Sequence, residues 1–186
     1  QSRWYDFCIS IFLFSFFKLG SIMKKKIVIL GSTGSIGKSL LNIINKDYNN
    51  FEIKLLTADK NYKLLLKQAK KFNVKNLIIT NKKKFDLLKK KTSKLNLNIF
   101  NNFNDFNKIL KNRVDYTMSS IIGINGLQPT LGIIKHTKNI AIANKESIIC
   151  GWNLIHKELK KNNTNFIPVD AEHFSLWYGM QNLNTS

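Results

Sequence analysis

The sequence predicts an α/β fold, a doubly wound and mostly parallel sheet with helices on both faces. Two observations lead to this prediction. From Met23 onward, short apolar runs alternate with longer amphipathic segments, and the first apolar run leads straight into a glycine-rich loop. Repeated alternation of strand and helix is typical of parallel sheets whose connecting helices cover both faces.

The apolar runs and the helical periodicity assign the elements in order. In the first helix Leu40, Leu41, Ile43 and Ile44 share one side. Pro129 falls in the first turn of another helix, where its missing N–H is harmless. We expect strands at residues 26–30, 52–58, 76–80, 98–100, 116–121, 140–143 and 166–169, and helices at 36–45, 62–72, 83–91, 103–110, 128–136 and 146–160.

Length and composition divide the chain into three parts. Its 186 residues suffice for one domain and part of another. Residues 1–22 begin with Gln1 and contain an apolar run shorter than the ~20 residues of a membrane-spanning helix. They fit a signal, an organelle leader, or sequence upstream of a true start at Met23, which we favour. We expect a cofactor domain over 23–165 and the start of a catalytic domain over 166–186.

The strong positive charge raises a nucleic-acid-binding module as an alternative. The chain has 30 basic and 11 acidic residues, a net charge of +19. However, only Arg3 and Arg113 are arginines, the side chain that dominates the recognition of phosphates and base edges. We therefore interpret the scattered lysines as a solvated surface and expect neither a specific nucleic-acid partner nor a membrane partner.

The loop after the first strand, residues 31–39, ends in Gly-Lys-Ser and so invites comparison with a nucleoside-triphosphate loop. That motif needs a glycine five positions before Gly37, and residue 32 is serine. The spacing Gly31-x-x-Gly34-x-x-Gly37 is instead a variant of the dinucleotide fingerprint of Rossmann-like folds. We expect a pyrophosphate at the start of the following helix, with hydroxyl donors from Ser32, Thr33 and Ser35.

The end of the second strand leaves the choice of dinucleotide open. An acidic residue here typically binds a ribose 2′-hydroxyl, whereas a basic residue accommodates a 2′-phosphate. The stretch contains Asp59 followed by Lys60 and Asn61, so both signals are present.

Two stretches in the second half carry further polar groups at expected strand ends. Asn144, Lys145 and Glu146 follow one strand, although the same residues suit a capped helix start. Asp170 and Glu172 share one side of an extended segment and suit Mg²⁺ or Mn²⁺, although a solvated turn would also contain them.

These stretches together resemble one family. The chain contains in order Gly-Ser-Thr-Gly-Ser-Ile-Gly at 31–37, Gly-x-x-Gly-Leu-x-Pro-Thr-Leu at 123–131, Ala-Asn-Lys-Glu-Ser at 143–147 and Pro-Val-Asp-x-Glu-His at 168–173. Their order and spacing closely resemble 1-deoxy-D-xylulose 5-phosphate reductoisomerase. This family is NADPH- and metal-dependent and makes 2-C-methyl-D-erythritol 4-phosphate for isoprenoid precursors.

The resemblance implies roles for individual residues. It favours NADPH as the cofactor. It implies that Lys145 engages the phosphosugar substrate. It also implies that Asp170 and Glu172 are ligands of Mg²⁺ or Mn²⁺ and that Glu172 is catalytic. It also implies a homodimer for the full-length enzyme. The implied cofactor contacts are Thr33, Gly34, Ser35, Ile36, Lys60, Asn61, Asn144 and Glu146.

The resemblance also sets expectations about activity. The third metal-binding carboxylate, the loop that closes over the substrate and the C-terminal domain would follow residue 186, and Ala171 replaces a serine usual in the family. We therefore expect the 186-residue polypeptide alone to turn over little or no substrate. Normal turnover with substrate, NADPH and Mn²⁺ would refute this expectation.

A different Rossmann-fold NAD(P)-dependent reductase, such as a semialdehyde dehydrogenase, remains an alternative. It would require a catalytic cysteine, and Cys150 lies in an expected helix rather than on a nucleophile turn. For location we expect a bacterial cytoplasm, or a plastid-type organelle if residues 1–22 belong to a leader.

Overall fold

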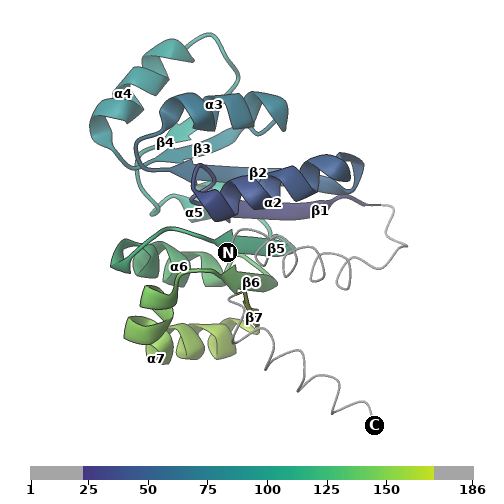
Figure 1. Cartoon of the computed structure of the whole chain (residues 1–186), viewed down its shortest axis with the longest axis vertical. Helices are drawn as coiled ribbons and strands as arrows, with labels where there is room; N and C mark the ends of the chain where they lie inside the picture. Colours follow the sequence, from purple (N-terminus) through teal and green to yellow (C-terminus); the bar gives the residue numbers. More distant parts are fainter. Residues whose placement is uncertain (1–22, 170–186) are drawn as a thin grey trace.

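The computed structural model describes residues 23–169, whose seven strands form a single sheet (Figure 1). All pairings in the sheet are parallel, and the strand order is β4-β3-β2-β1-β5-β6-β7. The strands are β1 (Lys25–Leu30), β2 (Phe51–Ala58), β3 (Asn76–Ile79), β4 (Asn98–Phe100), β5 (Tyr116–Ser119), β6 (Asn139–Ile142) and β7 (Asn165–Pro168). The predicted parallel α/β fold is confirmed.

Helices connect the strands in chain order. They are α2 (Ser35–Lys46), α3 (Tyr62–Lys71), α4 (Lys82–Lys91), α5 (Phe106–Ile109), α6 (Leu127–Ile134) and α7 (Lys145–Asn162), with the short 3₁₀ helices η1 (Tyr48–Asn50) and η2 (Ile124–Gly126). Among residues 23–169, no helix has the length and apolar character that crossing a bilayer requires.

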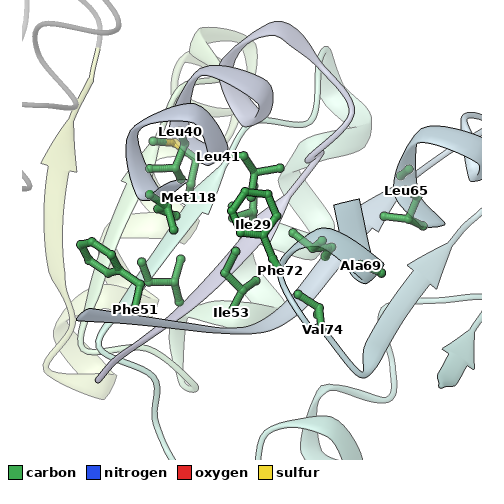
Figure 2. Packing of buried hydrophobic residues seen from close by; sticks show 14 of the residues in the cluster. Ile29, Leu40, Leu41, Phe51, Ile53, Leu65, Ala69, Phe72, Val74 and Met118 are labelled. Carbon is green, nitrogen blue, oxygen red and sulfur yellow. The ribbon is translucent and has the colours of Figure 1, made fainter. Parts of the chain in front are cut away.

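The sheet is covered on both faces, and the alternation of side chains along β1 shows how. Ile29 packs in a cluster with Leu40 of α2 and Leu65 of α3, and Figure 2 shows the side chains of α2 beside Ile29. Its neighbour Val28 points to the opposite face, into a cluster with residues of α5, α6 and α7. Because successive strand residues alternate between faces, one strand contributes to both cores, as a doubly wound sheet requires.

The structure differs from the sequence-based expectation at the fifth helix. The helix expected at 103–110 is reduced to Phe106–Ile109, because Asn102 accepts a hydrogen bond from the backbone of Asn104 and holds the preceding residues in a turn. Strand β7 pairs with β6, with Ile140 opposite Phe166, so residues 165–168 are part of this sheet. The expected division of the chain into domains stays a prediction.

The strand order changes direction in the middle of the sheet, between β1 and β5. From β1 the chain moves outward to β2, β3 and β4, and then returns to β5 on the other side of β1. After β1 and after β5 the chain therefore continues in opposite directions along the sheet. At such a switch point, ligands of doubly wound proteins bind beyond the carboxyl ends of the strands.

Candidate functional site

The glycine loop begins at this switch point and is held closely against its neighbours. Gly31 has a φ of +83°, a left-handed conformation that glycine adopts without strain. A Cβ atom at Gly31 would lie 2.8 Å from the carbonyl oxygen of Ser120, in the loop after β5. The loops that follow β1 and β5 are thus in direct contact.

Helix α2 starts from this loop without a side-chain cap. Its N-cap residue is Gly34, whereas α3, α4 and α7 are capped by the side chains of Asn61, Asn81 and Asn144. The first-turn N–H groups of Ser35 and Ile36 therefore point out of the helix at the carboxyl edge of the sheet. These donors, together with the positive end of the helix, suit an anionic ligand.

Gly34 and Gly37 have different surroundings. A Cβ atom at Gly37 would lie 2.6 Å from both the carbonyl oxygen of Gly31 and the Cα atom of Ser32, so α2 packs directly onto the loop. A Cβ atom at Gly34 would meet only the Gly31 oxygen, at 3.4 Å. The fold requires a glycine at 37, whereas there is room for a side chain at Gly34.

The structure shows that the prediction of a phosphate-facing hydroxyl at Ser32 is wrong. Ser32 is fully buried, and its hydroxyl donates to Oε1 of Gln68 at 2.8 Å, with the carbonyl oxygen of Thr57 a second, longer acceptor at 3.2 Å. Thr33 is half-buried and Ser35 is exposed, so their hydroxyls remain available at the edge. Lys38 is an exposed residue of α2, as expected.

The residues that would select the cofactor lie at the end of β2. The Thr80 hydroxyl donates to the Asp59 carboxylate at 2.8 Å, which turns this carboxylate toward the neighbouring β3 loop. Lys60 is exposed, and no carboxylate of residues 23–169 forms an ion pair with it. Asn61 caps α3 by accepting from the backbone N–H of Leu64.

Asn144 follows β6 and joins the loop after β5 to helix α7. Its Nδ2 donates to the carbonyl oxygens of Ile121 at 2.5 Å and Gly123 at 2.6 Å, while its Oδ1 accepts from the Ser147 N–H at 3.0 Å. The side chain is buried and both of its polar atoms are used within the protein. The cap predicted as the alternative role of Asn144 is confirmed, and its cofactor contact stays a prediction.

Asn144→Ala is expected to lower the free energy of unfolding by about 3 kcal/mol, since it removes a helix cap and leaves two carbonyl oxygens without their donor. Chemical denaturation of the chain measures this loss. Asn81→Ala is the matched control, because Asn81 caps α4 through one hydrogen bond, and it should cost about 1 kcal/mol. Equal losses for the two variants would show that the bonds from Asn144 to the loop do not stabilise the fold.

The predicted cofactor residues are thus gathered at one edge of the sheet. Thr33, Gly34, Ser35 and Ile36 follow β1, Lys60 and Asn61 follow β2, and Asn144 and Glu146 follow β6. Lys145 and Glu146 are exposed in the first turn of α7.

Thr57 and Gln68 hold this edge together, and the sequence did not predict either as a site residue. Thr57 Oγ1 accepts from the Gly31 N–H at 2.9 Å, and Gln68 on α3 forms two hydrogen bonds with Ser32. A signal for Gln68 was present, because its spacing places it on the apolar stripe of α3 with Leu65 and Ala69.

The predicted metal ligands Asp170 and Glu172 lie outside the described residues. Within 23–169, no group of three or more histidine, cysteine or acidic side chains could hold a metal ion. Cys150 is an exposed residue in the interior of α7 and is not on a strand-to-helix turn. The position does not fit a catalytic nucleophile of the semialdehyde dehydrogenase type.

Comparisons with known proteins agree with this geometry. The family model of 1-deoxy-D-xylulose 5-phosphate reductoisomerase matches residues 27–151. The reductoisomerase of Pelagibacter ubique is 59% identical over 160 residues, and that of Phocaeicola vulgatus is 36% identical over 156 residues. These matches cover 85% and 83% of this chain, and in each case 41% of the relative.

Solved structures of the same enzyme superpose on the described sheet. The Zymomonas mobilis reductoisomerase in complex with NADPH matches with a TM-score of 0.74 and 32% identity, over 81% of this chain and 40% of that chain. A second reductoisomerase, in complex with NADPH, fosmidomycin and magnesium, matches with a TM-score of 0.73 and 32% identity, over 80% of this chain and 37% of that one.

The chain therefore spans about two fifths of the length of the relatives that it matches. An L-tryptophan dehydrogenase from Nostoc punctiforme, 12% identical with a TM-score of 0.55, shares the fold alone. The family model covers most of the sequence, and the four ordered motifs are present. The chain belongs to the 1-deoxy-D-xylulose 5-phosphate reductoisomerase family.

Proposed function

We propose that residues 23–169 form the NADPH-binding part of a reductoisomerase. The complete protein would convert 1-deoxy-D-xylulose 5-phosphate to 2-C-methyl-D-erythritol 4-phosphate in isoprenoid precursor synthesis. Family membership supports this proposal, as do the two related structures, which are complexes with NADPH. The segment 170–186 would begin the catalytic domain.

One observation carries the proposal, namely the uncapped start of α2 beside an open Gly34 at the switch point of the sheet. A pyrophosphate needs several N–H donors and a close approach of the backbone. The donors would come from the first turn of α2, and the Thr33 and Ser35 hydroxyls flank it. The residues present therefore fit a dinucleotide.

The surroundings of β2 favour the phosphorylated cofactor. In a site for NADH, a carboxylate at this position would accept a hydrogen bond from the ribose 2′-hydroxyl. One oxygen of the Asp59 carboxylate accepts from Thr80, and the neighbouring Lys60 ammonium, which has no carboxylate partner within 23–169, is available to a 2′-phosphate. We assign Lys60 and Asn61 to the 2′-phosphate of NADPH.

The chemistry of the complete site would divide between cofactor, metal and side chains. When bound, NADPH supplies the hydride for reduction, and Mg²⁺ or Mn²⁺ held by Asp170 and Glu172 supplies Lewis acidity to the substrate oxygens. Both side chains are carboxylates, the ligands that these hard cations prefer. Lys145, exposed at the start of α7, would bring a positive charge to the phosphosugar, and Glu146 would contact the cofactor.

Lys60→Ala tests the cofactor assignment. We expect the variant to bind NADPH at least tenfold more weakly and NADH as the wild type does. A charge-assisted contact contributes ~1.5–3 kcal/mol, and only NADPH carries the extra phosphate. Titrations of both dinucleotides at fixed salt measure this. Lys63→Ala is the matched control, since Lys63 is another exposed lysine in the same segment. Equal weakening of both dinucleotides by Lys60→Ala would contradict the assignment.

Location and assembly are proposed from family membership. We propose a homodimer in the cytoplasm of a bacterium for the complete protein, and the bacterial relatives support this location. Sedimentation of the full-length protein tests the dimer, and fractionation of the source cells tests the location.

A further inference from the structure

The buried amide of Gln68 reaches the glycine loop from helix α3. Gln68 is 6% exposed, its Nε2 donates to the Ser32 carbonyl oxygen at 2.9 Å, and its Oε1 accepts from the Ser32 hydroxyl at 2.8 Å. The two hydrogen bonds connect residues 36 positions apart and use both ends of the amide. Such pairing fixes the orientation of both partners.

The first of these bonds sets the direction of a peptide group. Because the peptide unit is planar and trans, the N–H of Thr33 points opposite to the carbonyl of Ser32. Since Gln68 holds that carbonyl on the α3 side, the Thr33 N–H is directed away from Gln68. The Ser32 N–H donates to the Thr57 carbonyl at 2.9 Å, which fixes the preceding peptide in the same way.

We propose that Gln68 is a positioning residue for the cofactor: without touching it, its amide aims the Thr33 N–H at the pyrophosphate. This inference rests on the proposed NADPH site, to which it adds a residue that acts through Ser32. A buried glutamine on the apolar stripe of α3 costs desolvation unless it is fully bonded. The two hydrogen bonds between Gln68 and Ser32 explain why a polar side chain occupies this buried position.

Gln68→Met tests the proposal, because methionine has a similar length and cannot donate to the Ser32 oxygen. We expect NADPH to bind at least tenfold more weakly. In the free protein, the amides of Gly31, Ser32 and Gly34 should exchange their hydrogens faster, while amides of β5 keep their protection. Gln68→Glu, measured from about pH 7 to about pH 10, is the second variant, because its carboxylate, once the buried carboxyl has lost its proton, keeps an acceptor and removes the donor. At the alkaline end of this range it should have the same effects.

Thr92→Val is the matched control. Thr92 is buried, and its hydroxyl donates to the Leu88 carbonyl at 2.8 Å at the end of α4, away from the loop. Its loss should lower stability without changing NADPH affinity or loop exchange. The proposal is overturned if Gln68→Met and Gln68→Glu keep the wild-type loop protection, or bind NADPH as tightly as Thr92→Val does. If the wild-type protein does not bind NADPH, the proposed function is wrong. The hydrogen exchange of the loop amides then decides by itself whether Gln68 holds the loop in place.

Discussion

Gly34→Asp is expected to abolish NADPH binding while leaving the fold at least as stable as the wild type. Gly34 is the N-cap of α2 in an extended conformation, with φ −74° and ψ 175°, that any residue adopts. Aspartate is a favoured N-cap residue, so its carboxylate would accept from the first-turn N–H groups and stabilise the helix by a few tenths of a kcal/mol. The same carboxylate would occupy the donors that a pyrophosphate needs and would repel its charge.

Parallel titration and denaturation check both halves of this prediction. Gly34→Ala is the control that adds bulk without charge, and it should fold normally and weaken NADPH binding less than aspartate does. If the Gly34→Asp protein bound NADPH as tightly as the wild type does, the pyrophosphate would not bind at this loop. A Gly34→Asp protein that unfolded would show that Gly34 is needed by the fold itself.

Gly37→Ala is expected to destabilise the fold by about 3 kcal/mol, a cost typical of severe overpacking. The added methyl group would lie 2.6 Å from both the Gly31 oxygen and the Ser32 Cα. These are backbone atoms of a loop that is fixed on the other side by Thr57 and Gln68, so they cannot give way. Denaturant unfolding measures the loss.

Gly132→Ala is the control for Gly37→Ala. Gly132 lies in α6, and a Cβ atom there would meet only the Phe106 ring, at 3.4 Å. Because alanine favours the helix by roughly 0.5–1 kcal/mol, this variant should be as stable as the wild type or slightly more so. A similar loss at both positions would mean that close packing of α2 on the glycine loop is not what requires Gly37.

The sequence predicted the sheet well because its strands are buried on both faces. Runs such as 27–30 are apolar throughout, and turn residues bound them, so type and order follow from pattern alone. The glycine spacing likewise predicted the contact between α2 and the loop. The prediction failed at α5, where the Asn102 side chain accepts from the Asn104 N–H and holds the residues before the helix in a turn.

The polar support of the site could not be predicted in the same way. Whether Ser32 faces a phosphate or the protein interior depends on Thr57 and Gln68, which are 25 and 36 residues away. Periodicity gives the face on which a side chain lies, but it does not identify the partner of a buried polar group. The same holds for Asn144, whose two roles are indistinguishable until its bonds to Ile121 and Gly123 are known.

We expect this basic chain to bind a dinucleotide through its glycine loop. The decisive experiment is a titration of NADPH into the 186-residue wild-type chain at physiological salt, with duplex DNA titrated in parallel. NADPH should bind one-to-one and saturably in the micromolar range, and the duplex only weakly, with an affinity that falls steeply with salt. Tight binding of the duplex without binding of NADPH would show that the glycine loop does not hold a dinucleotide.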